Sequence, residues 1–125
     1  MSLAEGHFPG RAPLDAYGGG GFRFAEMSHH GSILCLPSGI WAWPVADAAA
    51  IDVAALAKVI AEAEAIELLL LGTGPALVPP RPEVRAALAG AGVRAETMST
   101  GAAARTYNVL LAEDRKVAAA LVAVE

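Results

Sequence analysis

The sequence has 125 residues, a length that suits one domain and argues against two. Its net charge of -4 at pH 7, with no basic patch or arm, argues against nucleic-acid binding. Hydrophobic residues make up 55% of the chain, yet every apolar stretch is far shorter than the ~20 residues of a membrane span. With no signal peptide apparent, we expect a cytoplasmic protein without a membrane span.

The first half of the chain is predicted to begin loosely and then to form short antiparallel strands. Residues 1–13 contain glycines and prolines with few apolar residues, so we expect a loose lead-in to one domain over residues 14–125. Residues 28–31 are predicted as a turn, and Pro44 should end the ladder because proline has no amide hydrogen. Strands of a meander are expected near Tyr17 and over residues 22–25, 33–36 and 40–43.

In the second half the pattern changes to helices that alternate with strands. Asp52 can cap a helix whose apolar residues recur at helical spacing, and Leu68–Leu71 is typical of a strand buried on both faces. Pro82 suits the first turn of a second helix. A strand over residues 93–98, a third helix and a last strand over residues 117–122 follow. The alternation predicts a single three-layer α/β domain, with a mixed central sheet and helices packed on it.

Two polar stretches follow predicted strands and form the candidate binding site. Ligands of open α/β sheets collect at the carboxyl ends of strands, and glycines there let a ligand approach the backbone. We expect the loop after the leucine strand and the start of the third helix, with Thr100 as its N-cap, to face one cleft. The candidate binding residues are Gly72, Thr73, Gly74, Met98, Thr100, Gly101, Arg105, Thr106 and Asn108.

The chemistry of this candidate cleft stays open at the level of sequence. The free amides at the helix start, together with Arg105, could hold a small anion such as a carboxylate or a phosphate. Arg105 could instead pair with an acidic neighbour, and Tyr107 could pack its ring in the core with its hydroxyl satisfied. The Gly72–Gly74 loop could equally be a turn with good backbone geometry.

No pattern in the sequence indicates catalysis or a metal centre. Cys35 is the single cysteine and lies in an apolar run, which favours a buried thiol over a nucleophile. His29 and His30 would point to opposite faces of a strand, and no third ligand stands at usable spacing. We therefore expect no catalytic residue, no metal and no cofactor. Trp41 and Trp43 share one face of a strand, either in the core or on a partner surface.

Several motifs occur in an order that resembles a known family. They include Leu69–Gly74, Met98–Asn108 and Val117–Leu121, of which Met98–Asn108 is the specific one, and the resemblance extends over residues 14–122. The chain resembles the small α/β domain family of bacterial and archaeal proteins that includes mitochondrial complex I (NADH dehydrogenase) assembly factor 3. The resemblance implies a three-layer α/β domain with a mixed sheet, and no established enzymatic activity.

The resemblance favours a non-enzymatic binding or assembly module with a protein partner, linked to respiratory complex assembly. An alternative remains: a binder of a small anionic ligand, or an enzyme acting on one, that uses the cleft between Gly72–Gly74 and the helix start over Thr100–Asn108. The high apolar fraction leaves a third interpretation, a domain that forms a homo-oligomer through an apolar surface.

Overall fold

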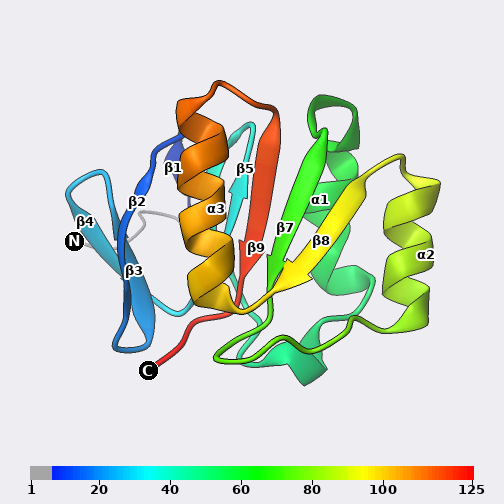
Figure 1. Ribbon diagram of the computed structural model, residues 1–125, viewed down its shortest axis with the longest axis horizontal. Helices are drawn as coiled ribbons and strands as arrows, with labels where there is room; N and C mark the ends of the chain where they lie inside the picture. Colours follow the sequence, from blue (N-terminus) through cyan, green and yellow to red (C-terminus); the bar gives the residue numbers. More distant parts are fainter. Residues whose placement is uncertain (1–6) are drawn as a thin grey trace.

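A six-stranded mixed sheet forms the middle layer of the protein (Figure 1). The computed structural model describes residues 7–125. The order of strands across the sheet is β1-β6-β5-β9-β7-β8, with one half antiparallel and the other parallel. The bounds are β1 (His7–Pro9), β5 (Ser32–Leu36), β6 (Gly39–Trp43), β7 (Leu68–Gly72), β8 (Arg94–Met98) and β9 (Val117–Leu121). The predicted mixed sheet is confirmed.

β9, the last strand in the sequence, lies in the middle of this sheet and joins its two halves. It pairs antiparallel with β5 and parallel with β7. The leucine strand β7 is paired on both sides, and three of its leucines, Leu69–Leu71, are fully buried. The prediction of a strand buried on both faces is therefore confirmed, because helices cover both faces of the sheet.

A second, three-stranded antiparallel sheet consists of β2 (Leu14–Gly18), β3 (Gly21–Phe24) and β4 (Met27–His30). The prediction of one continuous meander with a turn at residues 28–31 is wrong, because Met27–His30 is a strand that pairs with β3. Its side chains alternate between half-buried and exposed, so its sequence lacks the apolar pattern of a strand. Gly31, with φ of +110°, then redirects the chain into the main sheet.

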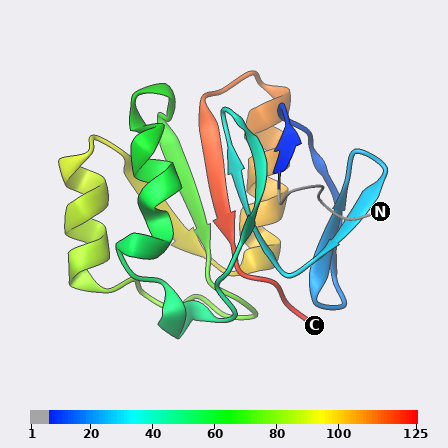
Figure 2. The same ribbon diagram turned by 180° about the vertical axis from the view of Figure 1, so that it is seen from behind.

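Helices cover both faces of the main sheet and complete the predicted three layers (Figures 1 and 2). On one face lie α1 (Ala57–Ala61), which continues the 3₁₀ turn Ala54–Leu56, and α2 (Pro82–Gly90). On the other face lies α3 (Thr100–Ala112), beside the small sheet. Pro82 occupies the first turn of α2, and the Asp52 carboxylate accepts a hydrogen bond from the Ala55 amide at 2.8 Å, as the sequence predicts.

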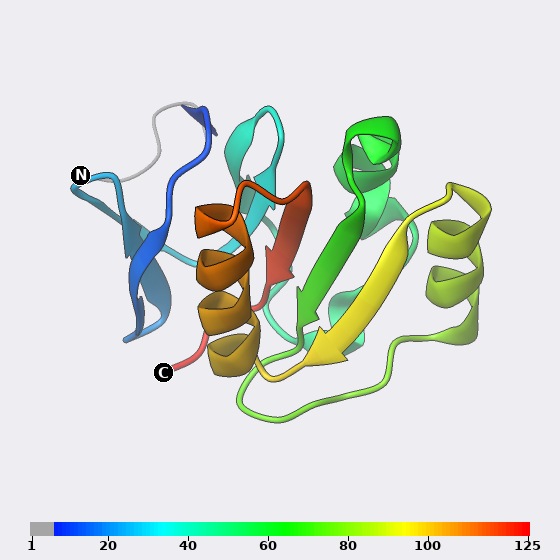
Figure 3. The same ribbon diagram turned by 45° about the horizontal axis from the view of Figure 1, so that its top comes forward.

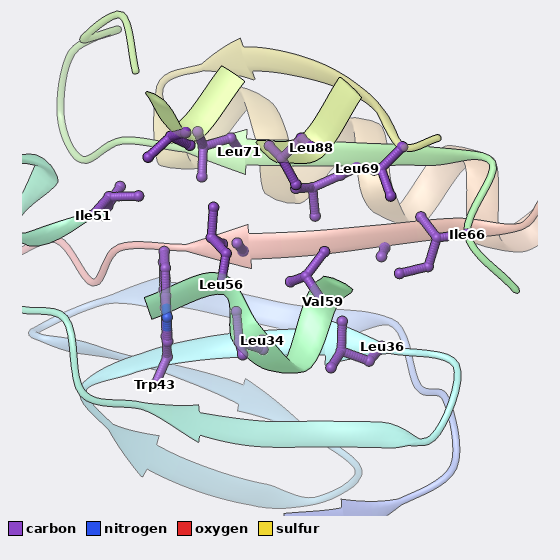
Figure 4. Close-up of a cluster of buried hydrophobic side chains, with 14 of the residues drawn as sticks. Leu34, Leu36, Trp43, Ile51, Leu56, Val59, Ile66, Leu69, Leu71 and Leu88 are labelled. Carbon is purple, nitrogen blue, oxygen red and sulfur yellow. The ribbon is translucent and has the colours of Figure 1, made fainter. Parts of the chain in front are cut away.

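Two hydrophobic clusters lie on opposite faces of the sheet. Figure 4 shows the first, in which Leu56 and Val59 pack between β5 and β7 side chains such as Leu34 and Leu69. The second lies under α3 and the small sheet and includes Phe24, Leu70 and Tyr107. Trp43 belongs to the first cluster, and its indole N–H donates to the Ala55 carbonyl at 2.8 Å. This resolves the open question for Trp43 in favour of the core.

Part of the predicted lead-in contacts the main domain. Residues 1–6 lie outside the described part of the chain, whereas His7–Pro9 pair with β6 as an edge strand. The His7 ring stacks on Trp41 with 3.7 Å between ring centroids. The Arg11 guanidinium donates to the Val117 carbonyl at 2.6 Å. Within the predicted lead-in, His7–Pro9 is therefore an edge strand of the main sheet. Over the described residues, no helix has the length and apolarity needed to cross a membrane.

Candidate functional site

Thr100 ties the start of α3 to two other segments of the chain. Its hydroxyl accepts a hydrogen bond from the Gly74 amide at 2.9 Å and donates one to the Val122 carbonyl at 2.6 Å. The Thr100 amide in turn donates to the Gly74 carbonyl at 2.8 Å. The side chain is fully buried. The loop after β7 and the start of α3, which the sequence analysis expects to face one cleft, bond to each other here.

The predicted N-cap role of Thr100 is wrong, because Ser99 is the N-cap. The Ser99 hydroxyl accepts a hydrogen bond from the Ala102 amide at 3.3 Å, and Ser99 has the extended backbone typical of a cap. Serine and threonine are both favoured at the N-cap, and Ser99 and Thr100 are adjacent, so residue preference alone does not decide which of them caps the helix. What separates them is the fixed position of Thr100 against the chain that leaves β9.

Gly72 and Thr73 hold the loop close to α3. A Cβ atom added at Gly72 would lie 3.0 Å from the Cα atom of Thr100, so only glycine allows this approach without displacement. The Thr73 hydroxyl donates to the Ala76 carbonyl at 2.8 Å and accepts from the Val78 amide at 2.9 Å. The Thr73 amide donates to the Met98 carbonyl of β8 at 3.0 Å, so Thr73 ties the loop both to itself and to β8.

Asn108 joins α3 to the first strand of the small sheet. Its side-chain oxygen accepts a hydrogen bond from the Leu14 amide at 2.8 Å, and its side-chain nitrogen donates to the Leu14 carbonyl at 2.7 Å. The Asn108 side chain thus bonds to both the backbone amide and the backbone carbonyl of Leu14, as a residue of a neighbouring strand would. Asn108 therefore holds the small sheet against α3.

Arg105 lies on the surface and contacts an aromatic residue that the sequence analysis missed. Its guanidinium donates a hydrogen bond to the Tyr17 hydroxyl at 3.0 Å. A Cβ atom added at Gly101 would collide with that same hydroxyl. Tyr17, Gly101 and Arg105 thus form one surface cluster. Its only signal in the sequence is the run of four glycines after Tyr17, which lets β2 turn back tightly beside α3.

A hollow of about 470 Å³ opens beside this cluster, at the N-terminus of α3. We call it the Arg105 hollow. The partial positive charge of the helix N-terminus and the guanidinium of Arg105 both favour a negatively charged group there. Glu125 at its rim opposes them. The lining residues are Tyr17, Gly74, Pro75, Ser99, Gly101, Arg105 and residues 123–125.

The predicted site residues divide into three groups around the Arg105 hollow. Gly74, Gly101 and Arg105 line it. Asn108 and Arg105 line an adjacent hollow of about 290 Å³ that faces β2. The other five lie outside both linings: Gly72, Thr73 and Thr100 are buried, and Met98 and Thr106 are half-buried.

Cys35 and Tyr107 are buried together under α3. Burial raises the pKa of the Cys35 thiol to about 12, and it also raises the pKa of the Tyr107 hydroxyl. Both groups therefore stay neutral at physiological pH, and the prediction that Cys35 is buried in the core is confirmed. Burial also lowers the pKa of His29. Among residues 7–125, no three side chains of His, Cys, Asp or Glu gather as metal ligands would.

The chain is similar to known proteins over almost its whole length. The profile of the family described as "Protein of unknown function (DUF498/DUF598)" matches residues 14–122. An uncharacterized protein of Rhodobacter capsulatus is 41% identical over 97% of this chain and 92% of that protein. The mouse NADH dehydrogenase [ubiquinone] 1 alpha subcomplex assembly factor 3 is 28% identical over 98% of this chain and 66% of its own length.

A solved structure supports the same relationship. The crystal structure of an outer membrane protein from Bartonella henselae superposes with a TM-score of 0.92 and 55% sequence identity. The match covers 95% of this chain and 100% of the other. The α/β architecture described above is therefore that of a solved relative.

Proposed function

The chain belongs to the DUF498/DUF598 family of proteins of unknown function, and we propose that it is a non-enzymatic module that binds a protein partner. The proposed partner takes part in the assembly of a respiratory complex. That part of the proposal rests on the distant similarity to the mouse assembly factor. The cytoplasm is the proposed location.

The observation that carries the proposal concerns the motif Met98–Asn108. Polar side chains of this motif bond within the chain and so serve the fold. The hydroxyl of Thr100 and the amide of Asn108 both bond to backbone groups of distant segments. These two residues hold the layers together. At the surface beside them, the side chains of Arg105 and Tyr17 line a hollow together with Ser99, Glu125 and small or apolar residues. Such a surface suits recognition.

The charge of the Arg105 hollow suggests what the partner presents. A helix N-terminus and a guanidinium together favour a carboxylate, either on an acidic side chain or at the end of a chain. Arg105 is exposed, and its hydrogen-bond partner Tyr17 is 40% exposed, so a partner can reach both without rearrangement of the core. We infer that the partner docks an acidic segment over this cluster.

Affinity purification of the tagged protein from its own host tests this proposal. We expect wild type to recover a stoichiometric partner, which mass spectrometry identifies. Arg105→Ala should recover about tenfold less, because a hydrogen bond to a charged group contributes about 1.5–3 kcal/mol. Arg85→Ala, which removes an exposed charge on α2, is the matched control. Absence of a stoichiometric partner, or equal recovery by Arg105→Ala, would contradict the proposal.

A second candidate function is the binding of a small anionic ligand in the Arg105 hollow. The guanidinium of Arg105 and the N-terminus of α3 at one hollow of about 470 Å³ favour it. Thermal-shift screening with phosphorylated and carboxylated metabolites tests it. A ligand at 100 times its dissociation constant adds about 2.7 kcal/mol of stability, and Arg105→Ala should abolish that gain. If no anion stabilises wild type, this candidate is wrong.

The proposed cytoplasmic location is tested separately by fractionation of host cells. We expect the protein in the same fraction as a cytoplasmic marker. The B. henselae relative is called an outer membrane protein, so recovery in the outer-membrane fraction is the result that overturns the proposal.

A further inference from the structure

β8 is the last strand at one edge of the main sheet, as Figure 3 shows. It pairs with β7 on one side, and three of its residues, Arg94–Glu96, are exposed. Edge strands present unpaired amides and carbonyls that can pair with another chain. The strand at the opposite edge, β1, is three residues long and includes Pro9, so β8 is the longer edge of the two.

The backbone groups of Ala95 and Thr97 point away from β7. In a parallel pair, successive residues direct their amide and carbonyl groups alternately towards the neighbouring strand and away from it. The Met98 carbonyl accepts from the Thr73 amide at 3.0 Å, which places the Met98 groups on the β7 side. By alternation the groups of Glu96 also face β7, whereas those of Ala95 and Thr97 face outward.

Arg94 and Glu96 carry opposite charges on one face of this edge. In the register with β7, Arg94 lies beside Leu68 and Glu96 beside Leu70, which faces the cluster under α3. Side chains two residues apart share a face of the sheet. Among residues 7–125, neither Arg94 nor Glu96 makes an ion pair within the chain.

We propose that β8 pairs with β8 of a second copy of this chain, antiparallel, about a two-fold axis at Ala95. The Ala95 amide of each copy then donates to the Ala95 carbonyl of the other. In this register Arg94 lies opposite Glu96 of the second copy, and Glu96 opposite Arg94. The pairing therefore forms two cross-strand pairs of opposite charge, which stabilise an antiparallel pair of strands.

The same charges disfavour the neighbouring registers. A two-fold axis at Glu96 would place the two Glu96 side chains opposite each other, and an axis at Arg94 would do the same for arginine. Like charges directly opposite one another are destabilising. The alternation of Arg94, Ala95 and Glu96 thus selects one register and makes the edge complementary to its own copy.

The face of β8 that lies towards α2 is partly open. A hollow of about 390 Å³ separates part of α2 from the face of β8 that carries Ala95 and Thr97. Ala95 itself presents only a methyl group there. Ala95 and its neighbours Arg94 and Glu96 are exposed, as pairing of this edge with a second chain requires.

Sedimentation of the wild-type protein over a range of concentrations is the first test, and we expect a monomer–dimer equilibrium. Glu96→Arg places two arginines opposite two arginines, and Arg94→Glu places two glutamates opposite two glutamates. Each variant should raise the dimer dissociation constant about tenfold or more. Glu64→Arg makes the same charge change at an exposed site away from β8 and should leave the dimer unchanged.

A mixture of the two variants distinguishes pairing across the axis from a general effect of charge. In a heterodimer of Arg94→Glu with Glu96→Arg, every opposite pair is again of opposite charge. We expect the mixture to dimerise although each variant alone does not. The double variant R94E/E96R should also dimerise like wild type, because it exchanges the two charges.

Two results would overturn the proposal: a wild-type protein that stays monomeric up to millimolar concentration, or a mixture that sediments as the sum of its components. Arg105→Ala leaves β8 intact and should dimerise like wild type. Failure of this inference is therefore distinguishable from failure of the proposed partner binding at the Arg105 hollow.

Discussion

The hydroxyl of Thr100 accepts a hydrogen bond from the amide of Gly74 at 2.9 Å, although the two residues lie 26 positions apart in the sequence. The same hydroxyl donates to the Val122 carbonyl, so one buried oxygen connects the loop after β7, the start of α3 and the exit of β9. Because all these groups are buried, the loss of the hydroxyl leaves two backbone groups without partners.

Thr100→Val should therefore lower the free energy of unfolding by about 3 kcal/mol, since each buried unsatisfied group costs about 1–3 kcal/mol. Valine keeps the shape of threonine, which isolates the hydroxyl. Urea denaturation measures the change. Thr106→Val, at a half-buried position of the same helix, is the control and should change stability by less than about 0.5 kcal/mol. Equal stability of the two variants would contradict the assigned role.

Asn108→Leu should loosen the small sheet from α3, because it removes both hydrogen bonds to Leu14. We expect a loss of about 1–3 kcal/mol and faster exchange of the Leu14 amide hydrogen with solvent. Hydrogen exchange measured by NMR separates this local effect from global destabilisation. An unchanged exchange rate at Leu14 in a folded variant would show that Asn108 does not hold β2.

Gly101→Ala should test the contact between α3 and Tyr17. Alanine favours a helix over glycine by about 1 kcal/mol, but its Cβ atom would collide with the Tyr17 hydroxyl and disturb the bond to Arg105. We expect no gain in stability in the wild-type background and a gain in a Tyr17→Ala background. A double-mutant cycle from thermal unfolding measures the coupling. Equal effects in both backgrounds would mean that the two residues do not interact.

Alkaline pH should destabilise the protein through Cys35. Burial in the folded state raises the thiol pKa from its ordinary value of 9.0 to about 12, so above pH 9 the unfolded chain loses this proton while the folded chain retains it. Stability is then full below pH 9 and falls as pH rises towards 12, by up to about 1.4 kcal/mol per pH unit for one group. Urea denaturation at pH 8 and pH 10.5 measures the decline, which should be smaller in Cys35→Ala. An equal decline in both proteins would contradict this account.

The elements that the sequence predicts best are those with strong local signals. Leu68–Leu71 forms the expected strand because four successive leucines require burial on both faces, and Pro82 begins α2 because its missing amide hydrogen is not needed there. The strand Met27–His30 is not predicted because its local signal is weak. It is an exposed strand with polar residues, and its existence depends on pairing with β3.

The candidate site divides in a similar way. The sequence places the two polar stretches at the carboxyl ends of two strands. Their contact follows from the adjacent, parallel arrangement of β7 and β8, which the sequence does not show. The partners of the individual side chains could not be predicted. Asn108 bonds to the backbone of Leu14, 94 positions away. Every residue has such a backbone group, so no residue type in the sequence marks Leu14 as the partner. The sequence predicts a strand near Tyr17 but does not place that residue at the site, because only the folding of β2 beside α3 brings it to Arg105.

The central position of β9 has a consequence for how the protein folds. The strands before it form two groups, β1, β5 and β6 on one side and β7 and β8 on the other, and only β9 pairs with both. The sheet cannot grow strand by strand along the chain, because its middle is made last. Until residues 117–121 pair with both halves, β5 and β7 each have an unpaired edge. Long-range pairing of this kind slows folding, so the partly folded chain is the state most exposed to aggregation.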